Sequence, residues 1–198
     1  MIQIRKKSDT LIIVIHEIYG INHHMQSFCE LISKEGFDVI CPNLLERDIT
    51  FDYSQEEVAY HDFMESIGFT QAQHKIQDIL SDAKGEYQKV FIIGFSVGAT
   101  VAWLCSKEER VDGIVGYYGS RIRNYVELKP KSPTMLIFPE EEQSFHVDEL
   151  IANLDNKNIK VYKFNGKHGF SDPYSPRYNV LSAQLAFSKT VDFIIKHS

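Results

Sequence analysis

The sequence predicts an α/β protein in which a mostly parallel β-sheet is covered by helices on both faces. Continuous apolar runs, such as T-L-I-I-V-I-H at residues 10–16, are typical of parallel strands buried on both sides. These runs alternate with stretches in which apolar residues recur at helical spacing. The chain has 198 residues, 43% of them hydrophobic, so we expect one domain with a full core over residues 1–198.

Seven segments have the apolar, β-branched or aromatic pattern of strands. In chain order they are residues 1–6, as a short edge strand, and then 10–16, 37–41, 90–93, 111–118, 134–138 and 159–164. The strand at residues 10–16, the helix after it and the next strand form a βαβ unit over residues 10–42. We expect its crossover to be right-handed.

Helical spacing of apolar residues marks the segments between the strands. The predicted helices cover residues 25–36, 54–66, 70–84, 99–104, 146–154 and 176–197. Gly68 and Gly85 separate or end two of them. Residues 43–53 have mixed charge and no period, so we expect an irregular surface loop there.

Charge and cysteine usage exclude several classes of protein. The formal net charge is -6 and no basic patch is visible, which argues against nucleic-acid binding. The apolar run at residues 11–15 is too short for a signal peptide or a membrane span, so no membrane association is expected. Cys29, Cys41 and Cys105 are scattered and form no C-x-x-C motif, which favours reduced thiols in a cytoplasmic protein.

The neighbouring His23 and His24 have no partner at the spacing of a metal motif. We therefore expect no metal site. Three aromatic residues in the helical region, Tyr60, Phe63 and Phe69, are expected to pack in or around the core rather than to bind a cofactor.

The motif G-F-S-V-G at residues 94–98 joins a predicted strand to a predicted helix. Ser96 lies at the apex of this turn, and Gly94 and Gly98 would let the strand and the helix pass closely without a Cβ clash. This arrangement predicts an exposed serine nucleophile at a helix N-terminus. Alone, the motif leaves open a simpler interpretation, in which Ser96 only caps the helix.

Four loops leave the carboxyl ends of predicted strands, and they should open at the same edge of a parallel sheet. They contain residues 17–20, residues 96–97, residues 140–142 and His168. A serine hydroxyl needs a base to take its proton and a carboxylate to orient that base. His168 is placed to be the base and one of the three glutamates the acid. The order serine, acid, histidine is that of the α/β-hydrolase fold.

Four short motifs are spread over nearly the whole chain. They are H-E-I-Y-G at residues 16–20, G-F-S-V-G-A at 94–99, P-T-M-L-I-F-P-E-E-E at 133–142 and H-G-F at 168–170. Together they resemble the dienelactone hydrolase family. The resemblance implies an α/β-hydrolase fold without a large lid domain, hydrolysis of esters or lactones of small carboxylic acids, and no cofactor. It also implies that the backbone N–H groups of Ile18 and Val97 form the oxyanion hole.

The sequence departs from the family pattern at two catalytic positions. Dienelactone-type members have cysteine as the nucleophile, whereas this chain has Ser96, as in esterase-like relatives. The family's acid is normally the aspartate of a G-x-x-D loop, and here Pro139 replaces the glycine and Glu142 the aspartate. Glu142 is therefore the predicted acid. Glu141 is the alternative, and Asp148 and Asp172 are less favoured by their positions.

A third departure concerns the substrate. The family's dienelactone enzyme has an arginine shortly after its histidine, where this chain has Asp172. An aspartate would repel a substrate carboxylate, so we do not expect a dienelactone substrate. Candidates for an apolar acyl pocket are aromatic residues, each of which can equally belong to the core: Tyr19, Tyr118, Phe145, Phe170 and Tyr174.

Glu17 directly follows a buried apolar strand, where a carboxylate is costly unless it is paired or hydrogen-bonded. In the family, the matching glutamate is linked to control of the nucleophile's protonation. With serine as nucleophile, two interpretations remain open. Glu17 either shapes the oxyanion loop or makes a purely structural buried hydrogen bond.

The sequence as a whole predicts a serine hydrolase that cleaves esters or lactones of small carboxylic acids through an acyl-enzyme intermediate. Its triad would be Ser96, His168 and Glu142. The alternative, motivated by the changed acid loop, is a catalytically silent α/β-hydrolase that binds a small ligand or a partner. A flavodoxin-like binding fold is less favoured, because no phosphate-binding glycine-rich loop follows the first strand. The oligomeric state stays open between monomer and weak dimer.

Overall fold

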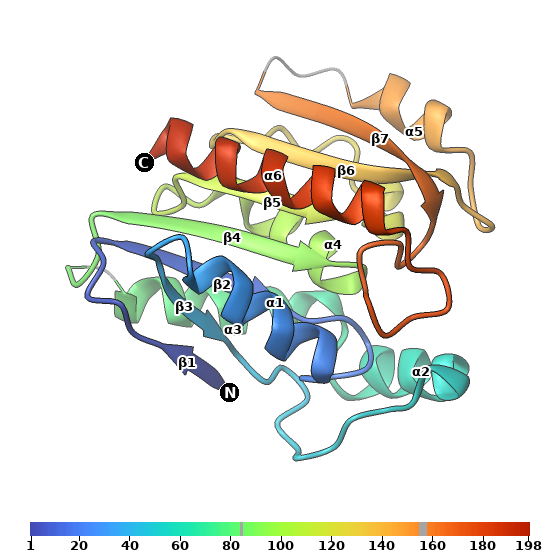
Figure 1. Cartoon of the computed structure of the whole chain (residues 1–198), viewed down its shortest axis with the longest axis horizontal. Helices are drawn as coiled ribbons and strands as arrows, with labels where there is room; N and C mark the ends of the chain where they lie inside the picture. The colour runs from blue at the N-terminus through green and yellow to red at the C-terminus, as the bar shows by residue number, and fades with distance from the viewer. Residues whose placement is uncertain (84, 155–157) are drawn as a thin grey trace.

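A seven-stranded sheet forms the centre of the computed structural model, which describes residues 1–83, 85–154 and 158–198 (Figure 1). The strands are β1 (Ile2–Ile4), β2 (Thr10–Ile15), β3 (Asp38–Cys41), β4 (Lys89–Phe95), β5 (Gly113–Tyr117), β6 (Thr134–Glu141) and β7 (Ile159–Lys167). Their order across the sheet is β1-β3-β2-β4-β5-β6-β7. The edge strand β1 is antiparallel to β3, and the other neighbouring pairs in the described chain are parallel.

Helices cover both faces of the sheet. They are α1 (His23–Ser33), α2 (Glu56–Ser66), α3 (Gly68–Ala83), α4 (Val97–Leu104), α5 (Val147–Asn153) and α6 (Val180–His197). Three short 3-10 helices accompany them, η1 (Tyr53–Gln55), η2 (Cys105–Lys107) and η3 (Ser120–Asn124). Helices α1 and α6 lie on the near face in Figure 1, and α3 and α4 lie behind the sheet.

The side chains of β2 show why its sequence is continuously apolar. Leu11, Ile13 and Ile15 belong to the core under α2, α3 and α4, whereas Ile12 and Val14 belong to the core under α1 and α6. All five are buried. Because successive residues of a strand point to opposite faces, a strand covered on both sides has no polar face.

The predicted fold class is confirmed, and the structure contains no large extra domain within the described residues. Several predicted strand ends differ from the structure, and those of β6 and β7 bear on the site. The predicted strands stop at residues 138 and 164, whereas β6 runs to Glu141 and β7 to Lys167. The two strands stay paired through a register shift between Pro139 and Glu141, so that Glu141 lies opposite Lys167. This shift is a local feature of the pairing that no hydrophobic pattern records.

The start of the last helix also differs from the prediction. It was expected at residue 176, but α6 begins at Val180, where the side chain of Asn179 caps the helix by accepting a hydrogen bond from the Ser182 N–H. The predicted helix over residues 70–84 corresponds to α3, which begins at Gly68. Its predicted last residue, Lys84, lies outside the described residues.

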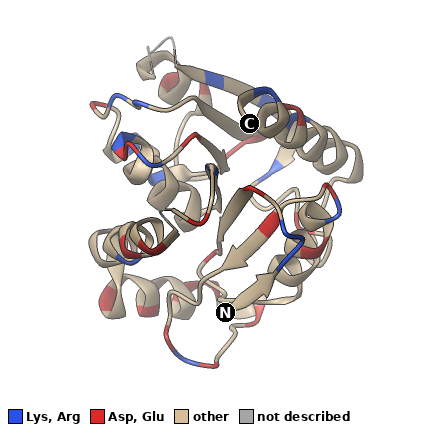
Figure 2. Cartoon of the chain, turned by 90° about the vertical axis from the view of Figure 1, so that its left-hand side faces the viewer, with Lys and Arg blue, Asp and Glu red and all other residues tan. Residues whose placement is uncertain are grey.

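The surface shows mixed charge. On the side of the molecule displayed in Figure 2, lysines and arginines are interspersed with aspartates and glutamates along loops and helices. Cys29, Cys41 and Cys105 are free thiols and all are buried. Within the described ranges, no helix combines the length and the apolar character needed to cross a bilayer.

Candidate active site

Ser96 lies in a tight turn between β4 and α4. Its φ of 52° and ψ of -113° are outside the ordinary regions for a residue other than glycine, so the backbone is strained at this point. The close approach of strand and helix requires the flanking glycines. A Cβ on Gly94 would lie 2.1 Å from the carbonyl oxygen of Gly98, where no atom fits. The turn therefore holds a half-buried serine at the helix N-terminus.

The start of α4 also packs directly on the end of β2. A Cβ on Gly98 would lie 2.4 Å from the carbonyl oxygen of Ile15 and 2.7 Å from that of His16. This contact brings the loop that carries Ile18 beside the turn that carries Val97. Neither the Ile18 nor the Val97 N–H has a hydrogen-bond acceptor among the described parts of the protein. Both donors thus remain free in the region of Ser96.

His168 follows β7 directly and begins the loop that leads to α6, drawn in red at the sheet edge in Figure 1. Its Nε2 is 2.9 Å from Ser96 Oγ. The ring also packs against Tyr118, with 4.9 Å between the ring centroids. Gly169, with a φ of 83°, turns the chain immediately after the histidine. The His168 ring thus lies between Ser96 and the ring of Tyr118.

Glu142 contacts the second ring nitrogen of His168. Its Oε1 lies 2.7 Å from His168 Nδ1, and its side chain is only 4% exposed. The alternative acid, Glu141, has a side chain that is 73% exposed and lies 3.8 Å from the Lys167 Nζ. Glu141 is the last residue of β6 and Glu142 the first residue after it, and only the Glu142 carboxylate contacts the histidine.

The electrostatic surroundings raise the pKa of His168. Burial lowers the pKa of the imidazole. The hydrogen bond to Glu142 and the negative charges of Glu142 and Glu17 together raise the pKa by more than burial lowers it. The net pKa of His168 is therefore above its ordinary value. A proton taken up from Ser96 would be well stabilised on this ring.

A cavity of about 1300 Å³ opens at the same sheet edge, and Ser96, His168 and Glu142 line it. Of the predicted pocket aromatics, Tyr19 and Phe145 line the cavity. Tyr118, Phe170 and Tyr174 are not among its lining residues, and Tyr118 and Phe170 instead take the other predicted place, in the core. Phe170 is fully buried in the core between the sheet and α6, and the buried Tyr118 bonds through its hydroxyl to Ser171 Oγ at 3.0 Å.

Comparisons with known proteins identify the family of the chain. Residues 2–198 match the model of the dienelactone hydrolase family. The protein YczH of Bacillus subtilis (strain 168), described as uncharacterized, is 40% identical over 187 residues, which are 93% of this chain and 90% of that protein. The chain belongs to the dienelactone hydrolase family. Its family and structural neighbours are hydrolases and esterases.

Two further similarities extend beyond this relative. A carboxymethylenebutenolidase of Pseudomonas putida is 25% identical in sequence to this chain, and the match covers 93% of this chain and 84% of that enzyme. The crystal structure of a dienelactone hydrolase-like promiscuous phosphotriesterase from metagenomic libraries has a TM-score of 0.74 at 15% sequence identity, over 95% of this chain and 86% of that one. At 15% sequence identity, the similarity to the phosphotriesterase structure concerns the fold alone.

One supporting residue was not recognised in the sequence. His16 is buried, and burial lowers its pKa to about 4, so the ring is neutral at pH 7. Its Nδ1 donates to the Glu17 carbonyl oxygen at 2.6 Å, and its Nε2 accepts from the Leu44 N–H at 3.0 Å. The ring thus fixes the backbone immediately before Ile18. In the sequence, the only signal for this role of His16 is its position at the end of a predicted strand.

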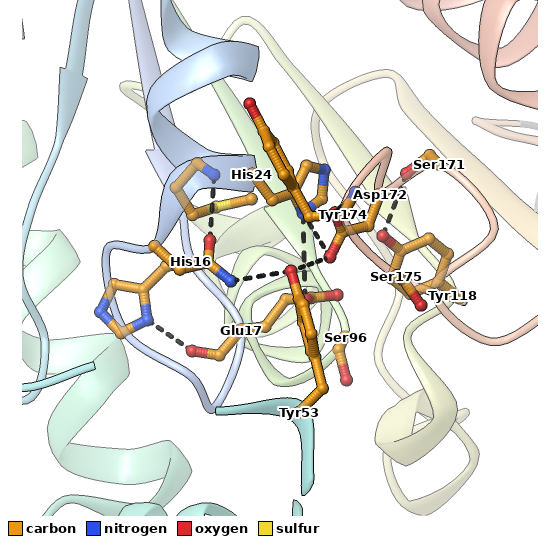
Figure 3. A network of polar contacts seen from close by, with 12 residues as sticks. His16, Glu17, His24, Tyr53, Ser96, Tyr118, Ser171, Asp172, Tyr174 and Ser175 are labelled. Carbon is orange, nitrogen blue, oxygen red and sulfur yellow. Dashed lines mark hydrogen bonds and ion pairs between the residues drawn. The ribbon is translucent and has the colours of Figure 1, made fainter. Parts of the chain in front are cut away.

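Glu17 lies in a buried polar network with residues that are distant in sequence (Figure 3). Burial raises the pKa of its carboxyl group, but His24, the charge of His168 and the Tyr118 hydroxyl lower it, and the net pKa is below the ordinary value. Asp172 belongs to the same network through His24, with 3.7 Å between Asp172 Oδ2 and His24 Nδ1.

Proposed function

We propose that this protein is a serine hydrolase that cleaves esters or lactones of small carboxylic acids through an acyl-enzyme intermediate. The observation that supports it most strongly is the position of the His168 ring. One ring nitrogen is 2.9 Å from Ser96 Oγ and the other is 2.7 Å from Glu142 Oε1. This is the geometry by which a base activates a serine while a carboxylate holds the base in one tautomer.

In the proposed first half-reaction, Ser96 Oγ attacks the carbonyl carbon of the ester and His168 Nε2 takes the hydroxyl proton. The carbonyl oxygen becomes an oxyanion, which the N–H groups of Ile18 and Val97 stabilise. Glu142 stabilises the imidazolium through Nδ1. When the C–O bond to the alcohol breaks, His168 gives its proton to the departing oxygen and the acyl group remains on Ser96.

The second half-reaction returns the enzyme to its starting state. Water takes the place of the alcohol, and His168 accepts its proton as the water oxygen attacks the acyl carbon. The second tetrahedral intermediate collapses, the bond to Ser96 Oγ breaks, and His168 returns the proton to the serine. The products are a carboxylic acid and an alcohol, which in a lactone remain parts of one molecule.

The cavity supports a small neutral substrate. Its volume of about 1300 Å³ leaves room for one, and Tyr19 and Phe145 supply aromatic surface. The loop after His168 supplies Asp172 where the dienelactone enzyme has the arginine that holds the substrate carboxylate. The proposal therefore covers uncharged esters and lactones and does not include dienelactone.

The pH dependence of the rate tests this mechanism. His168 acts as a base only when it is neutral, and its pKa is raised, so kcat/KM for p-nitrophenyl acetate should rise with pH with an inflection above the ordinary value of 6.5. The measurement is a set of initial rates from about pH 5 to 9, corrected for spontaneous hydrolysis. A flat profile, or a rate that falls as pH rises through this range, would contradict the role of His168.

A further inference from the structure

Three buried polar side chains from separate segments meet beside the proposed site (Figure 3). Glu17 follows β2, His24 lies in the first turn of α1, and Asp172 lies in the loop between β7 and α6. Their exposed fractions are 5%, 1% and 1%. Glu17 and Asp172 also line the cavity, so the cluster can be reached from solvent.

The distances within this cluster do not fit a hydrogen bond. His24 Nδ1 is 3.9 Å from Glu17 Oε2 and 3.7 Å from Asp172 Oδ2. A charge-assisted bond from an imidazolium to a carboxylate is about 2.7–2.9 Å long. Within the described chain, neither ring nitrogen of His24 has a hydrogen-bond partner. Such a group is rare in a protein interior and calls for an explanation.

The same distances do fit three ligands around one centre. The three ligand atoms lie within 4.8 Å of one another, and the imidazole nitrogen is almost equally far from the two carboxylate oxygens. Ligand atoms bonded to a tetrahedral Zn²⁺ at about 2.0–2.2 Å are roughly 3.3–3.6 Å apart. The two distances from His24 Nδ1 exceed this spacing by a few tenths of an ångström, and the two carboxylate oxygens, which lie within 4.8 Å of each other, would also have to approach.

Charge balance also favours a cation here. Asp172 accepts hydrogen bonds from the Tyr53 hydroxyl at 2.5 Å and from the Tyr174 N–H at 2.8 Å, which are the partners of a carboxylate. Buried carboxylates are costly unless a positive charge lies close to them. Among the described residues, no lysine or arginine forms an ion pair with Glu17 or Asp172, and the ion-pair contact that both share is with His24, which carries a charge only when protonated. One divalent cation with a neutral imidazole would balance both.

We propose that Glu17 Oε2, His24 Nδ1 and Asp172 Oδ2 bind one divalent transition-metal cation of the zinc class. One imidazole nitrogen and two carboxylate oxygens form a ligand set that Zn²⁺ accepts, and the cavity side leaves a fourth position for water. The cation would tie the loop of Ile18 to the loop of His168. The sequence predicts no metal site because His24 has no partner at the spacing of a metal motif, whereas these two carboxylates come from other segments of the chain.

Metal titration with a matched pair of variants tests the site. The wild-type protein, stripped with EDTA and dialysed, should bind one equivalent of Zn²⁺ in isothermal titration calorimetry. His24→Gln should weaken binding by at least about tenfold, whereas His23→Gln, which changes the exposed neighbouring histidine, should bind as the wild type does. No uptake by the wild type, or unchanged uptake by His24→Gln, would overturn the proposal.

If His24→Gln does not fold, spectroscopy of the wild-type protein tests the same ligands directly. X-ray absorption of the zinc-loaded protein should show a nitrogen and oxygen shell at about 2.0–2.1 Å with imidazole scattering. A sulfur shell, or an imidazolium at His24 with protons on both nitrogens in NMR of protein exposed to zinc, would refute it. Zinc uptake should be retained in Ser96→Ala. A failure of the hydrolase proposal is thereby distinguishable from a failure of the metal site.

Discussion

Replacing Glu142 with glutamine is expected to lower kcat for ester hydrolysis by about four orders of magnitude, as loss of the orienting carboxylate does in a serine triad. The change keeps the size of the side chain but removes the charge 2.7 Å from His168 Nδ1. An amide can donate its N–H to His168 Nδ1, which favours the tautomer with the proton on Nε2, and this nitrogen then cannot accept the serine proton. The neutral amide also cannot stabilise the imidazolium. The measurement is single-substrate kinetics with p-nitrophenyl acetate.

Glu141→Gln is the matched control, because it makes the same chemical change at the neighbouring position. The Glu141 side chain is 73% exposed and lies near Lys167 rather than His168. Its kcat should stay within a few fold of the wild-type value, since exposed ion pairs contribute about 0–1 kcal/mol. Equal losses in the two variants, or a larger loss in Glu141→Gln, would show that the acid has been assigned to the wrong residue.

Ser96→Ala is expected to reduce kcat by about four to six orders of magnitude, because it removes the atom that forms the acyl-enzyme bond. The substitution deletes a hydroxyl and adds no bulk, so the fold should persist, which circular dichroism would check. Ser144→Ala is the control. Ser144 is an exposed serine of the same cavity. Activity that survives Ser96→Ala at the wild-type level would exclude Ser96 as the nucleophile.

Much of the fold could be predicted because its signals are local. A strand buried on both faces must be apolar at every position, which is why the sequence of β2 was recognisable. The helix start at Val180 was not predictable to the residue, because it depends on the Asn179 cap and on turns that periodicity does not register. The extension of β6 to Glu141 depends on a register shift with β7, a property of the pair of strands rather than of either sequence.

The same difference between local and long-range information applies to the site. Ser96 was predicted from a local turn motif, and His168 from its place in the chain order after the serine and the acid. Both signals can be recognised in the sequence without knowing which segments lie side by side. Sequence favoured Glu142 over Glu141 only through the family alignment, and the contact of Glu142 with His168 Nδ1 is visible in the structure alone. Sequence could not reveal that His24 lies between Glu17 and Asp172, because the fold alone brings these three segments together.

The most direct test of Ser96 as an activated nucleophile is labelling with a fluorophosphonate followed by intact-mass spectrometry. Such a probe reacts rapidly with a serine only when a neighbouring base takes its proton. We predict one adduct per chain in the wild type, located on the peptide that contains Ser96, and none in Ser96→Ala. An absence of adduct at high probe concentration, or an adduct on another residue, would contradict the account and favour a catalytically silent member of the family.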